Sequence, residues 1–277
     1  MDRFDATLRT ETIALVDRLA VDRHALALSR IELFSATLHR LLVENGERYD
    51  ALVTAGTSGL YMQALARATY RLLAIEPPPT ICLPIVRFAE GGALFDNTSL
   101  AAEVCRQLGE KRRLERVLFV DDEIRRGTVA HACFDLLLRS DCVDAGKGIV
   151  CTIVAENHFF EWHWDQPGIA VRYLAPARLL YGLQHNIAHC LPNDLREEAR
   201  RCVDPKIGHH ELMAMVVAGS VKRMRGDTAF FDEAPARLVA SRIPDFQARR
   251  ERFLLDFEGW VQSGVRKYRD GEIRFRF

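Results

Sequence analysis

The feature that most constrains the fold is a series of short apolar runs separated by stretches with helical spacing. Four runs are almost uninterrupted, which is typical of strands buried on both faces of a parallel sheet. They cover residues 51–54, 81–86, 117–120 and 148–155, and a shorter run at 170–174 follows. Strands that alternate with helices form βαβ units with right-handed crossovers. The sequence therefore predicts an α/β fold with a mostly parallel sheet.

The segments on either side of this alternation have a different pattern. Residues 1–47 show helical spacing, so we expect an N-terminal helical extension that ends near Asn45-Gly46. We expect no strand after residue 175, and helices at 194–203, 208–225 and 245–262. The chain then divides into a helical extension, an α/β core at 48–175 and a mainly helical region at 176–277. This last region is either a small domain or a helical cover on the sheet.

Charge and cysteine content exclude several classes of function. Lys plus Arg and Asp plus Glu both number 38, so no overall charge favours a nucleic-acid partner. The seven cysteines lack the spacing of metal ligands, which indicates reduced thiols. No apolar run approaches the roughly 20 residues that span a membrane. We therefore expect a cytoplasmic protein with neither membrane nor nucleic acid as partner, and we leave open whether it forms a homodimer.

The most informative segment is residues 117–128, in which Asp121 and Asp122 directly follow an apolar run. In an open α/β sheet, ligands bind beyond the carboxyl ends of the strands. The turn and the helix that starts at Gly127 offer backbone N–H groups to a phosphate. Adjacent carboxylates accept hydrogen bonds from a sugar diol or hold Mg²⁺ through waters. The segment therefore predicts a sugar-phosphate site.

This segment resembles the signature of the type I phosphoribosyltransferases: four apolar residues, an acidic pair, four more residues and a glycine. The resemblance implies that family's fold, with the catalytic residues Asp121 and Asp122 gripping the ribose hydroxyls of 5-phosphoribosyl-1-pyrophosphate. Mg²⁺ is the implied cofactor, held by the same pair either directly or through water. The resemblance also places Glu123, Arg125, Arg126, Gly127 and Thr128 around the 5-phosphate.

Two further segments match the order of motifs in that family. Ala55, Gly56, Thr57, Ser58 and Gly59 resemble the loop that binds pyrophosphate, because its glycines let backbone amides approach an anion closely. Arg87 resembles the basic catalytic residue that contacts pyrophosphate, and residues 88–97 would form a flap over the reaction. Because parallel strands end at one edge, we expect the loops at Gly56 and Asp121 to be neighbours.

The chain also departs from the family pattern. Arg125 and Arg126 stand where the family has hydroxyl residues, and Thr128 replaces a small residue. The resemblance, which covers residues 48–175, implies transfer of a phosphoribosyl group to a nitrogenous acceptor with release of pyrophosphate. The alternative is a non-catalytic regulator that keeps the fold and senses a nucleotide or phosphosugar. In the structural alternative, Asp121 and Asp122 are only a polar strand end.

Other candidate residues lie near the sheet edge or in the C-terminal region. Phe159, Phe160 and Trp162 follow the strand at 148–155, where they either stack on a base or pack under the C-terminal helices. The spacing of His185, His189 and Cys190 suits zinc, but no further ligand is evident, so we expect no metal there. We interpret residues 209–211 (His-His-Glu) as helix surface or helix capping.

Overall fold

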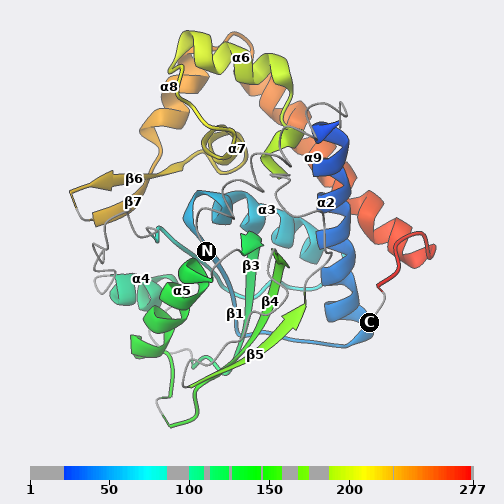
Figure 1. Cartoon of the computed structure of the whole chain (residues 1–277), viewed down its shortest axis with the longest axis vertical. Helices are drawn as coiled ribbons and strands as arrows, with labels where there is room; N and C mark the ends of the chain where they lie inside the picture. The colour runs from blue at the N-terminus through cyan, green and yellow to red at the C-terminus, as the bar shows by residue number, and fades with distance from the viewer. Residues whose placement is uncertain are drawn as a thin grey trace, which may run out of the picture.

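The structure is a computed structural model that describes residues 22–85, 100–108, 113–124, 127–144, 146–157, 168–174, 187–226 and 228–275. Within these residues, a five-stranded sheet has the order β2-β1-β3-β4-β5, and all its strand pairs are parallel (Figure 1). Its strands are β1 (Ala51–Ala55), β2 (Thr80–Leu83), β3 (Arg116–Ile124), β4 (Ile149–Asn157) and β5 (Ile169–Leu174). The predicted α/β fold with a mostly parallel sheet is thus confirmed.

The strand order creates a switch point between β1 and β3. The chain passes from β1 outward to β2 and then returns to the other side of β1 to form β3. Connections on the two sides of such a point leave the sheet in opposite directions and open a crevice at the carboxyl edge. By this rule, the N-terminus of α3, which follows β1, and the carboxyl end of β3 lie beside the switch point.

Both faces of the sheet are apolar because alternate residues of each strand pack on opposite faces. Val117 and Phe119 of β3 join the apolar cluster beneath α4 (Leu100–Leu108) and α5 (Thr128–Arg139). Leu118 and Val120 join the cluster beneath α3 (Gly56–Leu72). The part of β3 that is buried on both faces, residues 117–120, has no polar residue, which explains its uninterrupted apolar run.

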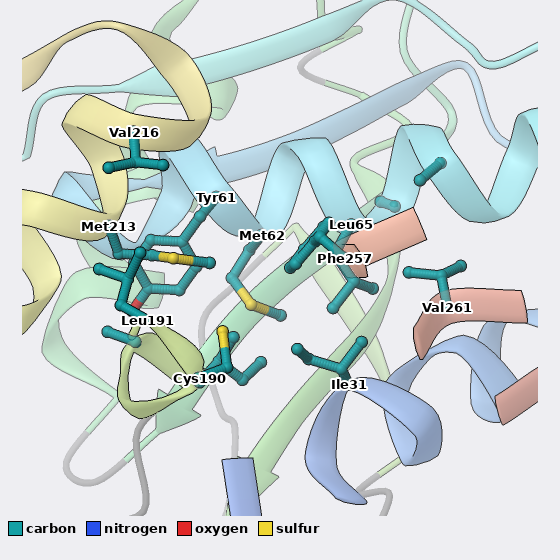
Figure 2. Close-up of a cluster of buried hydrophobic side chains, with 14 of the residues drawn as sticks. Ile31, Tyr61, Met62, Leu65, Cys190, Leu191, Met213, Val216, Phe257 and Val261 are labelled. Carbon is teal, nitrogen blue, oxygen red and sulfur yellow. The ribbon is translucent and has the colours of Figure 1, made fainter. Parts of the chain in front are cut away.

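The second cluster also includes the helices of both flanking regions. Helix α2 (Arg23–His39) continues as a π-helical turn (Arg40–Glu44). Figure 2 shows Ile31 of α2, Leu65 of α3 and Phe257 of α9 (Phe246–Arg269) converging on one apolar region. The N-terminal and C-terminal helices therefore share a continuous core with the sheet, and the C-terminal region packs as a cover.

The C-terminal region contains two strands that the sequence reading missed. Its remaining elements are η2 (Ile187–Cys190), α6 (Asn193–Cys202), α7 (His209–Ala218), β6 (Val221–Arg225), β7 (Thr228–Asp232) and α8 (Ala234–Arg242). The expectation of one helix over 208–225 and of no strand after 175 was wrong, because Gly219 ends α7 with a φ of 71°. The chain then forms the antiparallel pair β6–β7. Among the described residues, no helix combines the length and the apolar character needed to cross a membrane.

Candidate functional site

Asp121 and Asp122 lie on a bulge inside β3 rather than after its end. Val120 pairs with Val154 and Glu123 pairs with Glu156, so the two aspartates stand opposite a single residue of β4. The extra residue reverses the alternation, because Val120 packs in one apolar cluster and Ile124 in the other. Bulges of this kind occur beside active sites, where they redirect side chains. The expected strand end at residue 120 was therefore wrong by four residues, although the acidic pair still marks an irregular point of the sheet.

The predicted loop at residues 56–59 is the first turn of α3, which follows β1 directly. This turn needs glycine at two positions for two different reasons. Gly56 has a φ of 68°, a conformation that other residues adopt only with strain. At Gly59, a β-carbon would lie 3.1 Å from the backbone carbonyl carbon of Thr54 and 3.2 Å from the sulfur of Cys82. The chain can therefore turn sharply from β1 into α3 and stay close to the ends of β1 and β2.

The first turn of α3 contacts the acidic pair directly. The Ser58 hydroxyl donates to Oδ1 of Asp121 at 3.2 Å, and the backbone N–H of Asp122 donates to the same oxygen at 2.9 Å. The loops after β1 and within β3 are thus neighbours at the sheet edge, as expected. Thr57 lies with Ser58 in the first turn of α3, where backbone N–H groups lack helical partners.

Asp122 belongs to a three-residue hydrogen-bond chain. The Tyr61 hydroxyl donates to Oδ2 of Asp122 at 2.7 Å and lies 2.7 Å from Nδ1 of His210. Burial, followed by the nearby Asp122 carboxylate, raises the pKa of Tyr61 well above its usual range. The Tyr61 hydroxyl therefore stays protonated, and its single hydrogen is used in the hydrogen bond to Asp122. His210 must then donate its Nδ1–H to the tyrosine oxygen.

Burial makes the charge of the acidic pair expensive unless other groups compensate it. Asp121 is 5% exposed and Asp122 is 8% exposed. Arg30 of α2 is also buried, and its pKa is lowered to about 10 by burial although the charges of Glu123 and Asp122 oppose this shift. A polar strand end would lie in water, whereas these carboxylates lie among donors and a cation.

Gly127 directly precedes α5 and has the conformation that a tight turn requires. Its φ is 69°, and it is the N-cap residue of the helix. The helix starts at Thr128, so the N–H groups of its first turn point back toward the end of β3. These groups are suited to an anion, because the N-terminus of a helix carries a partial positive charge.

Several predicted site residues lie outside the described residues: Arg87, Arg125, Arg126, Phe159, Phe160 and Trp162. The predicted flap at 88–97 and His185 lie outside them too. Their assignments stay predictions.

The described residues do not form a resident metal centre. No group of three or more His, Cys, Asp or Glu side chains among them is placed to hold a metal ion. Asp121 and Asp122 also each use one oxygen to accept hydrogen bonds from Ser58 and Tyr61. Mg²⁺ in proteins is often bound by one or two carboxylates together with substrate phosphates, so the pair fits only an ion that arrives with a phosphorylated ligand.

The sequence reading missed three residues of the site: Arg30, Tyr61 and His210. Tyr61 follows Ser58 by three positions, so both side chains leave one face of α3 toward β3. His210 was interpreted as helix surface or capping. Glu211 does cap α7, with Oε2 3.0 Å from the Gly208 nitrogen, but the half-exposed His210 side chain faces Tyr61.

The geometry thus joins two glycine-containing segments, an acidic pair and a tyrosine-histidine pair at the carboxyl edge of the sheet. Comparison of the sequence with protein-family models and with curated proteins found no match.

Proposed function

We propose that this chain binds 5-phosphoribosyl-1-pyrophosphate at the carboxyl edge of its sheet and transfers the phosphoribosyl group to a nitrogenous acceptor. The observation that carries the proposal is the contact between Ser58 and Asp121, which joins the two predicted ligand loops at the switch point. A type I phosphoribosyltransferase would need this neighbourhood, since its ligand touches both loops.

Each part of the ligand has a chemical counterpart in the proposal. The ribose hydroxyls bond to Asp121 and Asp122, and the 5-phosphate is held at Gly127 and the first turn of α5. The segment from Ala55 to Gly59 and Arg87 receive the pyrophosphate, and Phe159, Phe160 and Trp162 are candidates to stack on the acceptor. Mg²⁺, brought in with the ligand, neutralises the pyrophosphate charge.

The reaction requires positioning and charge stabilisation rather than a covalent enzyme intermediate. The acceptor nitrogen forms a bond to the anomeric carbon while the bond from that carbon to the pyrophosphate oxygen breaks. Pyrophosphate leaves with the electron pair, and the acceptor loses a proton to a base. The buried carboxylates beside the ribose stabilise the positive charge that develops on the sugar.

A second candidate function is binding without turnover. One observation favours it: Tyr61 already occupies Oδ2 of Asp122, so a ligand hydroxyl must share that carboxylate with the tyrosine. The replacement of two hydroxyl residues by Arg125 and Arg126 points the same way. Such a protein would sense the phosphosugar and release no pyrophosphate.

The test is a calorimetric titration of 5-phosphoribosyl-1-pyrophosphate with Mg²⁺, followed by a pyrophosphate-release assay with a panel of nitrogen bases. Asp121→Asn keeps an oxygen that accepts from Ser58 but removes the charge. We expect it to weaken binding by about 1.5–3 kcal/mol with little change in melting temperature. Asp141→Asn, exposed beyond the end of α5, is the matched control.

Three results separate the candidates. Binding with pyrophosphate release supports the transferase, and binding without release by any base supports the sensor. No binding by the parent at millimolar ligand refutes both proposals. A large loss of stability in Asp121→Asn would instead assign that carboxylate to the structure of the sheet edge.

A further inference from the structure

A group of basic side chains converges beside the acidic pair from four separate segments. We define the basic cluster as Arg23 of α2, His189 of η2, Arg196 and Arg200 of α6, and His209 and His210 of α7. The rings of His189 and His209 lie 4.5 Å apart between centroids. Nη1 of Arg196 lies 2.8 Å from Nδ1 of His209, so the guanidinium donates to the imidazole.

The positive charge of this cluster comes from its arginines. Burial, followed by the charge of His209 and of the arginines around it, lowers the pKa of His189 to about 3. Burial and Arg196 lower the pKa of His209 to about 4. Both imidazoles are therefore neutral near pH 7, and the arginines supply the charge of the cluster.

Within the described part of the chain, Arg196 forms no ion pair with a carboxylate, and its buried Nε has no hydrogen-bond partner. Carboxylates also lie near the cluster. Burial, followed by the charge of Arg200, lowers the pKa of Arg196, and Glu197, the next residue of α6, opposes this shift. Asp122 lies beyond His210. Glu211 is used in capping α7. A half-buried guanidinium whose buried Nε lacks a partner is unfavourable unless an anion binds to it.

The cluster borders the candidate site. Nδ1 of His210 lies 3.7 Å from Oδ2 of Asp122, and His210 follows His209 directly in α7. Figure 1 shows α7 and α6 above the carboxyl edge of the sheet. The candidate site therefore has the acidic pair of β3 on one side and the basic cluster on another.

We propose that the basic cluster binds an anionic group of the acceptor, so that the acceptor is a nitrogen heterocycle bearing a carboxylate. This inference rests on the proposed function, in which the acidic pair binds the ribose. The planar fork of Arg196 suits the two oxygens of a carboxylate, and a neutral imidazole N–H adds a further donor. A neutral base would leave the guanidinium without an anion and so bind more weakly.

The experiment uses pairs of bases that differ only in charge: orotate against uracil, and nicotinate against nicotinamide. Each is titrated into the full chain, with and without 5-phosphoribosyl-1-pyrophosphate and Mg²⁺. We expect each acid to bind about tenfold or more tightly than its neutral partner, the ratio of one hydrogen bond to a charged group. Arg196→Gln should abolish this preference.

Two further variants keep the test sharp. Arg200 is exposed on the same helix, so Arg200→Gln removes a charge but leaves the contact between Arg196 and His209 in place. This variant should reduce the preference by a smaller factor. Arg201→Gln, also exposed on α6 and without a contact in the cluster, is the control and should change nothing.

The outcomes distinguish this inference from the proposed function. If the acids are preferred but 5-phosphoribosyl-1-pyrophosphate does not bind, the proposed function fails and the anion site stands. If the phosphosugar binds but acids and neutral bases bind equally, the inference is overturned. Failure of all four bases to bind at millimolar concentration, or an unchanged preference in Arg196→Gln, also overturns it.

Discussion

Two tyrosines of α3 offer a direct test of the hydrogen-bond chain at the acidic pair. Tyr61 and Tyr70 are both almost completely buried, and both rings pack in the same apolar cluster. The Tyr61 hydroxyl bonds to Asp122 and His210, whereas the Tyr70 hydroxyl has no hydrogen-bond partner among the described residues. Replacing each with Phe removes a hydroxyl from the same helix, in one case a hydrogen-bonded hydroxyl and in the other a hydroxyl without a partner in the described part of the chain.

We expect Tyr61→Phe to lower the free energy of unfolding by about 1.5–3 kcal/mol, because the buried Asp122 charge loses a donor. For a chain of this size that corresponds to a fall in melting temperature of roughly 3–12 °C. Tyr70→Phe removes an unsatisfied buried hydroxyl, so it should be neutral or stabilise by up to about 1 kcal/mol.

The assay is urea unfolding followed by circular dichroism, with the midpoint and slope compared among the parent and both variants. An unchanged slope ensures that the shift in midpoint reports stability. Equal losses in the two variants would show that the hydroxyl contacts do not matter. A larger loss in Tyr70→Phe would refute the assignment of the hydrogen-bond chain.

Two further predictions concern helix contact and pH. Gly264→Ala in α9 should destabilise the protein by about 1–3 kcal/mol or more, because the new β-carbon would overlap the Glu32 carbonyl. A β-carbon at Gly259 meets no atom, so Gly259→Ala should stabilise the protein by roughly 0.5–1 kcal/mol. Thermal melts compare the two variants, and equal effects would contradict the close contact between α2 and α9. His189 has a folded pKa of about 3, below its usual 6.5, so the unfolded chain binds more protons between these values and stability falls as pH drops through that window. The slope is at most about 1.4 kcal/mol per pH unit, reduced by solvent screening, and His189→Gln should flatten it in urea titrations at pH 7 and 5. An unchanged slope would place His189 in a more exposed setting.

The architecture of the core could be predicted because its signal is local. A strand buried on both faces shows as an uninterrupted apolar run, and Gly56 and Gly127 mark turns that need a positive φ. The β6–β7 pair was missed although Gly226, with a φ of 62°, begins the turn between two short runs. Its first strand is rich in Lys and Arg, so the apolar pattern there is weak.

The contacts of the site could not be predicted, because they depend on register and on long-range packing. The bulge at Asp121 arises from pairing between β3 and β4, which no local pattern encodes. Arg30 and His210 reach the acidic pair from helices at opposite ends of the chain. Each has the sequence context of an ordinary helix residue, so only the tertiary structure reveals its role.

The positions of these residues indicate that the flanking regions complete the site. The resemblance to the phosphoribosyltransferases covers residues 48–175, yet Arg30 precedes that segment and His210 follows it. An acidic pair this deeply buried needs a nearby cation and donors, since an uncompensated charge there would be neutralised or would unfold the edge of the sheet. The charge of Arg30 lies close enough to Glu123 and Asp122 to act with theirs, and His210 extends the Tyr61 contact toward solvent. The α/β core alone would therefore lack both the Arg30 cation and the His210 donor beside the acidic pair.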